Sequence, residues 1–234
     1  MKSKYKWAGG LFLLWVVFII LLKTVDVAAI GPEGTSVGFS AINSAVHNLT
    51  GFNSTMYTVS KIFGYIVILA GLAFGVVGVL HIFRRRHIMK ADPAILATFG
   101  LYFMFVVIYL FFELVIINYR PVILPGEEHV EASFPSSHSM LAVMIMGSYY
   151  LLSQRYIAED KTKLIVRIVC IVLMAGTVLT RLFAGVHWLT DIIGGVWIGA
   201  VLIIAYDGVL DVCDEYRRKK KKKKKARPQE NAQA

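Results

Sequence analysis

The feature that most constrains this chain is the repetition of long apolar stretches. Five of them approach or exceed the roughly 20 apolar residues that a helix needs to cross a bilayer, and they are residues 7–30, 62–83, 95–117, 164–183 and 188–210. A sixth, residues 138–152, is shorter, and it crosses if the serines before it begin the helix and the polar residues after it reach the far surface. We therefore predict an all-α protein, an integral membrane bundle of six transmembrane helices.

Composition agrees with this prediction and limits the number of domains. The chain has 234 residues, of which 57% are hydrophobic and 17% charged, and its mean hydropathy is +0.64, which is too apolar for an ordinary soluble domain. The first stretch follows lysines, as in a secretory signal peptide, but its length and the lack of a small-residue cleavage site indicate a retained anchor. We predict one membrane domain over residues 1–216 and a basic, disordered cytoplasmic tail over residues 217–234.

The positive charges are divided unevenly among the connections, and they predict an orientation. The segments before the first stretch and after the second, fourth and sixth carry most of the basic residues. These are Lys2, Lys4, Lys6, Arg84, Arg85, Arg86, Lys90, Arg155, Lys161, Lys163, Arg167 and the run at 217–225. Because cytoplasmic connections are enriched in Lys and Arg, we expect a multi-pass plasma membrane protein, preferably of a bacterial inner membrane, with both termini in the cytoplasm.

The net charge of +10 comes mostly from the basic tail, so it does not indicate a nucleic acid partner. A basic run beside a membrane helix attracts anionic lipid headgroups with about 1 kcal/mol per Lys or Arg. We expect the tail to contact such headgroups.

The connection at residues 31–61 contains an apolar pattern of its own. Ile42, Ala45, Val46 and Leu49 recur at the spacing of one helix face. This pattern predicts an interfacial helix, which acts either as a lid over a site or as a packed connector.

Polar residues that hydrophobicity does not explain fall into three groups, all at the outer ends of predicted helices. The groups are Arg120-Pro121, then Pro135-Ser136-Ser137-His138, then Arg181 with His187 and Asp191. Charged residues within a membrane bundle are functional candidates, and three distant segments meet at one membrane depth. We therefore predict a single site at the outer face.

His187 and Asp191 are the candidate catalytic pair. Their spacing of four places both side chains on one helix face, where a carboxylate orients an imidazole and stabilises its cation when the other ring nitrogen attacks an electrophile. The alternative is an ordinary ion pair at the start of a helix.

The other two groups provide anion-binding chemistry. Arg120 and Arg181 each carry a planar guanidinium suited to phosphate oxygens, although each alone also fits an interface anchor. Ser136 and Ser137 fall at the start of a helix, whose free N–H groups attract anions. His138 in the first turn is placed to give a proton to a leaving oxygen, and the alternative is an ordinary serine cap beside an interfacial histidine.

The three groups together resemble the signature of the type 2 phosphatidic acid phosphatase family, which shares its site with the vanadium haloperoxidases. The family pattern is Lys-x6-Arg-Pro, Pro-Ser-Gly-His and Ser-Arg-x5-His-x3-Asp. Order, spacing and position at the helix ends agree, and the similarity covers the helical core from about residue 62 to residue 210. The resemblance implies a core like that of acid phosphatases and vanadium haloperoxidases.

The resemblance also implies a metal-independent mechanism without a cofactor. His187 would attack phosphorus with Asp191 orienting it, and His138 would protonate the departing lipid oxygen. The phosphoryl oxygens would be held by Arg120, Arg181, Ser136 and the backbone near Ser137. The expected activity is the hydrolysis, at the outer face, of a lipid phosphomonoester or diphosphate of the polyprenyl diphosphate, phosphatidate or phosphatidylglycerol phosphate type.

This chain departs from the family pattern at three positions. Ser137 replaces Gly and leaves the amide available, and Thr180 replaces Ser and keeps a hydroxyl. Glu113 replaces Lys, so a phosphate-binding cation has become a carboxylate. It either positions Arg120 or Arg181, contacts a positive or hydroxyl-bearing part of the substrate, or accompanies a reduced activity. The pattern thus leaves two alternatives to a phosphatase, a lipid phosphotransferase and a weakened lipid-binding or transport protein.

Overall fold

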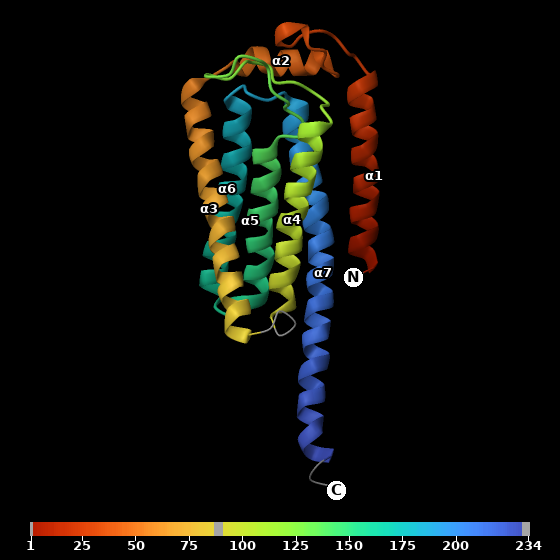
Figure 1. Ribbon diagram of the computed structural model, residues 1–234, viewed down its shortest axis with the longest axis vertical. Coiled ribbons are helices and arrows are strands. Elements are labelled where there is room, and N and C mark those ends of the chain that lie inside the picture. Colours follow the sequence, from red (N-terminus) through yellow and green to blue (C-terminus); the bar gives the residue numbers. More distant parts are fainter. Residues whose placement is uncertain (1, 87–90, 231–234) are drawn as a thin grey trace.

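The computed structural model describes residues 2–86 and 91–230, and most of these residues are helical. Its elements are α1 (Lys2–Thr24), a 3-10 turn (Pro32–Gly34), α2 (Ser40–Thr50), α3 (Ser54–Arg85), α4 (Pro93–Leu114), α5 (Ser137–Tyr156), α6 (Asp160–Phe183) and α7 (Leu189–Glu230). The long helices stand side by side, and α2 lies across one end of them (Figure 1). The prediction of an all-α helical bundle is confirmed.

The predicted number of six membrane spans is not confirmed. Of the described helices, five are long and apolar enough to cross a bilayer, namely α1, α3, α4, α6 and α7 up to Lys220. The remaining long helix, α5, contains several serines and has nine buried residues. It packs against α3, α4, α6 and α7. Because its neighbours enclose it, α5 does not need an apolar composition of its own.

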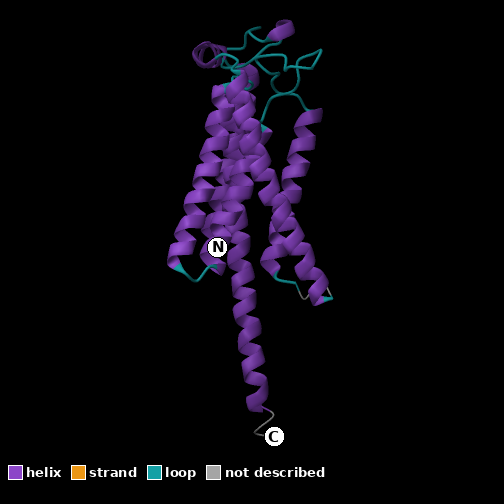
Figure 2. Ribbon diagram, turned by 90° about the vertical axis from the view of Figure 1, so that its left-hand side faces the viewer, coloured by secondary structure: helices purple, strands orange, loops and turns teal. Residues whose placement is uncertain are grey.

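Helix boundaries follow local chemistry. The side chain of Asn53 accepts a hydrogen bond from the Met56 amide and caps the start of α3. Asp92 does the same for the Ala94 amide at the start of α4, where Pro93 occupies the first turn. The long connections gather at the end of the bundle that holds α2, opposite the two termini (Figure 2).

The N-terminal helix α1 is attached to α7 by two indole groups. Trp15 donates its ring N–H to the Gly194 carbonyl at 3.0 Å, and Trp197 donates to the Leu11 carbonyl at 3.1 Å. A buried indole N–H needs such a partner. The two bonds run in opposite directions between the helices, so they fix both the contact and its register.

The start of α5 is held close to the start of α7. The Ser136 amide donates to the Asp191 carbonyl at 2.9 Å. The approach depends on Gly195, because a Cβ there would lie 2.5 Å from the Ser136 carbonyl oxygen. This contact brings the serine-histidine segment to the segment that holds His187 and Asp191.

The helix predicted in the first long connection is present as α2, but its apolar face is not packed. Ile42 is 51% exposed and Leu49 is 87% exposed. The bundle is contacted instead by Asn43, which bonds Thr190 and Gly38. Side-chain amide bonds thus attach the helix through its polar face, and whether it acts as a lid or as a connector stays a prediction.

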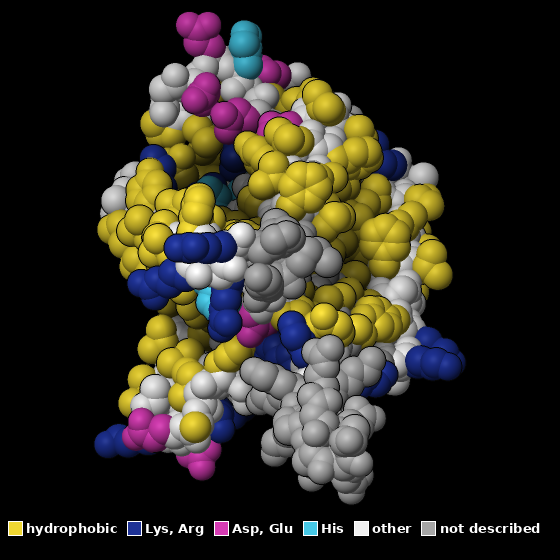
Figure 3. All heavy atoms as spheres, turned by 60° about the horizontal axis from the view of Figure 1, so that its bottom comes forward, with side chains coloured by type: hydrophobic (Ala, Val, Ile, Leu, Met, Phe, Trp, Pro, Cys, Tyr) yellow, Lys and Arg dark blue, Asp and Glu magenta, His cyan; other side chains and the backbone are white. Residues whose placement is uncertain are grey.

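A charged network closes the end of the bundle that carries the termini. Arg155 bonds three carboxylates on successive turns of α7, those of Asp207, Asp211 and Asp214, at 2.7 to 3.1 Å. Lys4 bonds Asp207 and Asp211 at 2.7 Å. The side chain of Arg155 was expected to extend to the surface, whereas it is paired within the bundle. Figure 3 shows Lys and Arg side chains gathered at this end, next to a hydrophobic belt.

The segment predicted as a disordered tail continues α7 as far as Glu230. Lysine and arginine have favourable helix propensities, so composition does not oppose this continuation. Residues 231–234 of the tail and Lys90 of the orientation argument lie outside the described residues. The domain boundary at residue 216 stays a prediction.

Candidate active site

Two short segments of the connection between α4 and α5 pair with each other and form the base of the site. Residues 118–120 and 131–133 run antiparallel, with a bridge between Tyr119 and Ala132. The Arg120 amide donates to the Glu131 carbonyl at 3.0 Å, and the Ser133 amide donates to the Asn118 carbonyl at 2.9 Å. We call this pair of segments the ladder. Alternate residues of an extended segment point the same way, so Asn118 and Arg120 share a side.

The ladder positions His187, which lies between α6 and α7 and is 4% exposed. Its Nδ1 is 3.1 Å from the Ser133 carbonyl oxygen, and its Nε2 is 3.1 Å from Nη1 of Arg120. A carbonyl only accepts and a guanidinium only donates. The partners therefore assign the proton to Nδ1 and leave a lone pair on Nε2.

Asp191 lies in the first turn of α7 and is fully buried. Its Oδ1 accepts from the Asn118 side chain and its Oδ2 from the Trp188 amide, both at 3.0 Å. The distance from Oδ2 to Nδ1 of His187 is 3.8 Å, which exceeds a hydrogen bond. The carboxylate lies beside the imidazole as expected, but the hydrogen bond that sets the tautomer goes to Ser133.

The two predicted arginines have different surroundings. Arg120 pairs with Glu131 at 3.0 Å through Nε and donates to the Val186 carbonyl at 3.2 Å. Arg181 is only 3% exposed, donates to the Ser60 hydroxyl at 3.2 Å and lies over the ring of Tyr57.

Arg181 is also incompletely satisfied. Its buried Nε has no hydrogen-bond partner, and among the described residues no carboxylate forms an ion pair with it. Burying a cation without a counter-charge is costly. An anion bound at this end of the bundle would supply the missing partner.

The charges around His187 keep its imidazole neutral. Burial and then the positive charges of Arg120 and Arg181 lower the pKa of His187 well below its usual value, with His138 adding to the effect. The bond to the Ser133 carbonyl opposes this shift only in part. A neutral imidazole with a free Nε2 lone pair is the form that acts as a nucleophile.

The segment from Ser136 to His138 is only partly directed toward a small cavity that His187 and Arg120 line. Ser137 lines it, whereas Ser136 is buried and shares a 3.0 Å hydrogen bond with Ser139. The predicted cap by a serine side chain is absent at the start of α5. The ring of His138 packs on the backbone of α3 at Gly64, where a Cβ would come within 2.7 Å of the ring.

Thr180 and Glu113, two of the three positions at which this chain departs from the family pattern, lie in different places. Thr180 donates to the Gly176 carbonyl at 2.6 Å, within its own helix. Glu113 is exposed in the last turn of α4 and lines the same cavity as Arg120 and His187. The pairing of Glu113 with Arg120 that the sequence suggested is wrong, because α4 ends at Leu114 and the ladder gives Arg120 a different partner, Glu131.

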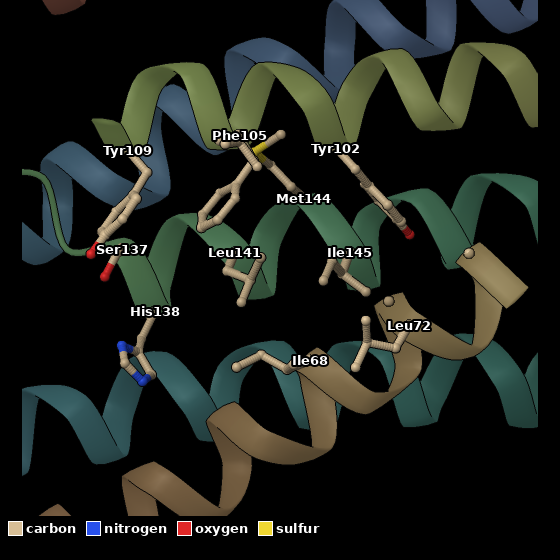
Figure 4. Close-up of a pocket in the computed structure, with 13 residues that line it drawn as sticks. Ile68, Leu72, Tyr102, Phe105, Tyr109, Ser137, His138, Leu141, Met144 and Ile145 are labelled. Carbon is tan, nitrogen blue, oxygen red and sulfur yellow. The ribbon is translucent and has the colours of Figure 1, made fainter. Parts of the chain in front are cut away.

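Two hollows meet at this site. The cavity over His187 and Arg120 has a volume of only about 30 Å³, room for one or two water-sized groups. Beside it, a groove of about 510 Å³ runs between α3, α4 and α5 and is lined almost entirely by apolar side chains. His138, Ser137 and Tyr109 lie at the end of this groove nearest the cavity (Figure 4).

Sequence reasoning missed three residues of the site, namely Asn118, Glu131 and Ser133. The signal that would have found them is polar alternation on each side of the Pro121 turn, Asn118 with Arg120 and Glu131 with Ser133. In the part of the chain that the structure describes, no three His, Cys, Asp or Glu side chains gather as metal ligands.

Fold and site together define a class of protein, the multi-pass helical membrane proteins that carry a histidine and arginine site at one end of the bundle. The sequence model of the PAP2 superfamily matches residues 111–208 of this chain. The resemblance to type 2 phosphatidic acid phosphatases is thereby confirmed.

Individual relatives agree with this family. Phosphatidylglycerophosphatase B of Bacillus subtilis (strain 168) is 31% identical over 101 residues, which cover 43% of this chain and 50% of the relative. The chain thus matches half the length of this curated relative.

One solved structure of low sequence identity shares the fold. The crystal structure of a transmembrane PAP2 type phosphatidylglycerolphosphate phosphatase from Bacillus subtilis superposes with a TM-score of 0.62 at 20% identity, covering 87% of this chain and 96% of that chain. LpxE of Aquifex aeolicus gives a TM-score of 0.45 at 20% identity over 72% of this chain and 95% of that one.

Proposed function

We propose that this protein is a metal-independent lipid phosphate phosphatase that acts through a phosphohistidine at His187. The observation that carries the proposal is the unprotonated Nε2 of a neutral, buried imidazole, which accepts a hydrogen bond from Arg120. His187 lines a cavity together with Arg120, and the positive charge of Arg181, whose Nε is unsatisfied, acts on the same imidazole. Among proteins of this fold, such an arrangement suits attack on a phosphoryl group.

In the first step, the Nε2 lone pair of His187 forms a bond to phosphorus and the bond from phosphorus to the lipid oxygen breaks. His138 gives its proton to that oxygen, so the lipid leaves as a neutral alcohol, or as a lipid phosphate when the substrate is a diphosphate. The Ser133 carbonyl and the nearby Asp191 carboxylate stabilise the positive charge on the imidazole.

In the second step, His138 takes a proton from water, and the water oxygen attacks phosphorus. The bond from phosphorus to Nε2 breaks, phosphate leaves, and the lone pair of His187 is restored. Arg120, Arg181 and the amide of Ser137 hold the equatorial oxygens in both steps, because phosphoryl transfer depends mainly on positioning and charge stabilisation. The direct role of the Ser136 hydroxyl is the weakest of the expected contacts, since that hydroxyl is bonded to Ser139.

The apolar groove supports a lipid as the substrate. Its open side lies among exposed apolar residues of α3 and α4 such as Leu72 and Val106, so a hydrocarbon chain enters from the bilayer. Polyprenyl diphosphate, phosphatidate and phosphatidylglycerol phosphate all have the required phosphate and tail. With the basic residues at the opposite end in the cytoplasm, the site faces outward, as in a bacterial inner membrane.

The test is release of inorganic phosphate by the purified protein in detergent from a panel of these lipids, with a chelator present and no acceptor lipid. We expect turnover by the unsubstituted protein, and a loss of at least about a thousandfold in the His187→Ala variant, as for removal of other nucleophiles. Turnover that needs an acceptor lipid would indicate phosphotransfer instead. A His187→Ala variant that retains activity would refute the proposal.

A further inference from the structure

The guanidinium of Arg120 is held on two sides by different parts of the site. On one side Nε donates to Oε2 of Glu131 at 3.0 Å. On the other side Nη1 contacts Nε2 of His187 at 3.1 Å and the Val186 carbonyl at 3.2 Å. Among the described residues, Nη2 makes no hydrogen bond.

This arrangement places a donor on the lone pair with which His187 would attack. A phosphoryl group has to displace Nη1 from that position, and the cavity of about 30 Å³ is too small for a phosphoryl group until it does. The bond at Nε does not need to break. If the guanidinium of Arg120 rotates about its Nε–Glu131 hydrogen bond, Nη1 and Nη2 both turn toward the phosphate oxygens and bind them as a fork.

We propose that Glu131 is a positioning residue that holds Arg120 at Nε, so that the guanidinium alternates between the lone pair of His187 and the substrate phosphate. The inference rests on the proposed function of His187 and Arg120. Among the described residues, the Glu131 side chain bonds Arg120 and makes no hydrogen bond to His187.

The carboxylate of Glu131 is not needed to keep the two segments together. The backbone already joins them through the bond from the Arg120 amide to the Glu131 carbonyl and through the Tyr119–Ala132 bridge. The Glu131 side chain is 43% exposed, and ion pairs so accessible to solvent add little to folding stability. Variants at Glu131 should therefore fold, and their defects should report on the orientation of Arg120.

A pH profile distinguishes this role from a structural one. The groups that face His187 are Arg120 from the ladder, Arg181 from α6, His138 from α5 and Asp191 from α7. The charge of Arg120 lowers the pKa of His187. If Arg120 is released from Glu131 and moves away from His187, the pKa of His187 rises. As the pH is lowered, His187 is then protonated earlier, and activity falls at a higher pH than in the unsubstituted protein.

The experiment measures kcat and KM for a lipid phosphate against pH in detergent, for the unsubstituted protein and for three variants. Glu131→Ala removes the acceptor, whereas Glu131→Gln keeps a neutral oxygen acceptor for Nε. Glu128→Ala is the matched control, because it removes an exposed carboxylate from the same connection. Thermal unfolding of each variant, with and without inorganic phosphate, is recorded alongside.

We expect Glu131→Ala to lower kcat/KM by roughly 10- to 100-fold, as for other misplaced catalytic groups, and to move the acid limb to higher pH. Glu131→Gln should restore most of the activity, and Glu128→Ala should match the unsubstituted protein. An unmoved acid limb, a Glu131→Gln variant as weak as Glu131→Ala, or equal profiles for Glu131→Ala and Glu128→Ala would each overturn the inference.

Failure of the proposed function would be visible separately. If the unsubstituted protein releases no phosphate from any lipid, that function is refuted, and the thermal shift with inorganic phosphate then tests Glu131 by itself. A shift that is lost in Glu131→Ala and kept in Glu128→Ala supports the positioning of Arg120 at an anion site. A shift equal in both variants contradicts it.

Discussion

His187 has both of its ring nitrogens engaged, one by a carbonyl and one by a guanidinium. The Ser133 carbonyl accepts from Nδ1 and Arg120 donates to Nε2. A contact that keeps the tautomer thus lies on one side of the ring, and a contact that a phosphoryl group would have to displace under the proposed function lies on the other. The chemistry of the site is decided by these neighbours more than by the histidine itself.

At the residue scale, the first prediction concerns pH. Because burial and nearby cations lower the pKa of His187, the imidazole stays neutral as pH falls through its usual value of about 6.5. We expect the acid limb of kcat/KM to lie below that value. The same shift predicts how stability depends on pH. As pH falls below about 6.5, the unfolded chain binds the proton of His187 before the folded chain does, so the free energy of unfolding decreases.

The phosphate of the substrate also ionises, near pH 6, and could produce an acid limb of its own, so the prediction needs a control. The Arg181→Gln variant removes a cation that lowers the pKa of His187, so its acid limb should move to higher pH, while the free substrate is unchanged. A limb that stays in place in this variant belongs to the substrate, and the assignment to His187 would be incorrect.

A second prediction at this scale concerns Glu113, which lines the cavity beside Arg120. The Glu113→Lys variant places a cation where the family has one, so turnover of ordinary lipid phosphates should rise by about tenfold, equivalent to 1.4 kcal/mol in the barrier. Glu113→Gln should give a smaller rise in the same assay. A collapse of activity in both variants would instead indicate that Glu113 has a structural role.

Sequence identifies Arg120 and the residues of the site that lie at helix ends, and it does not identify the other polar residues of the ladder. His187 and Asp191 have a helical spacing, which predicts their proximity. Glu131 and Ser133 meet Arg120 and Asn118 through the register of two short segments within an irregular connection. That register is set by tertiary contacts, and no local periodicity encodes it.

At the scale of elements, the contact between α5 and α7 determines whether the segments of the site meet. We expect Gly195→Ala to push the Ser136 backbone away, since the added Cβ would lie 2.5 Å from a carbonyl oxygen. Overpacking of this kind costs about 1–3 kcal/mol. The unfolding temperature in detergent and the rate of phosphate release should both fall.

The matched control for this prediction is Gly100→Ala on α4, where an added Cβ meets nothing within 4 Å. Alanine is a better helix former than glycine by about 1 kcal/mol, so this variant should be as stable as the unsubstituted protein or more so. Equal effects of the two substitutions would mean that the α5–α7 approach is looser than described.

Helix positions were predictable from the apolar stretches, but faces and lengths were not. The pattern of Ile42 and Leu49 predicted α2 correctly as a helix, but it did not indicate which face contacts the bundle. Asn43 makes that contact because its amide bonds Thr190 of α7 and the Gly38 carbonyl. Such long-range hydrogen bonds override a local hydrophobic pattern.

At the scale of the whole molecule, three aromatic rings lie between the apolar groove of α3, α4 and α5 and a second cavity. A second apolar cavity of about 390 Å³ lies further along the same helices, toward the termini. Phe74 lines it and stacks edge-on against Tyr102, which lines the groove, and against Tyr149, which lines the second cavity. These three rings separate the two hollows.

We therefore predict that Phe74→Ala joins the groove to the second cavity and shifts the preference toward longer lipid tails. The measurement is kcat/KM for a series of lipid phosphates that differ only in chain length. Phe83→Ala, an exposed aromatic near the end of the same helix, serves as the control. An unchanged chain-length profile in Phe74→Ala would show that the tail does not extend to these rings.

The apolar stretches predicted a helical bundle, whereas the predicted number of six spans is not confirmed, because α5 is not apolar enough to be identified as a span by its composition. A helix enclosed by its neighbours does not need the composition that lipid contact requires. Ser139, Ser148 and Ser153 of α5 are buried. Hydropathy alone therefore does not determine how many helices of this bundle cross a membrane.

The position of the site at one end of α5 gives the reaction a sidedness. α5 has 20 residues, so the cavity and the opposite end of that helix are about 30 Å apart. A phosphate displayed on the other leaflet is thus beyond reach. Transbilayer movement of the lipid would have to precede hydrolysis, and dephosphorylation at this site would report which leaflet a lipid occupies.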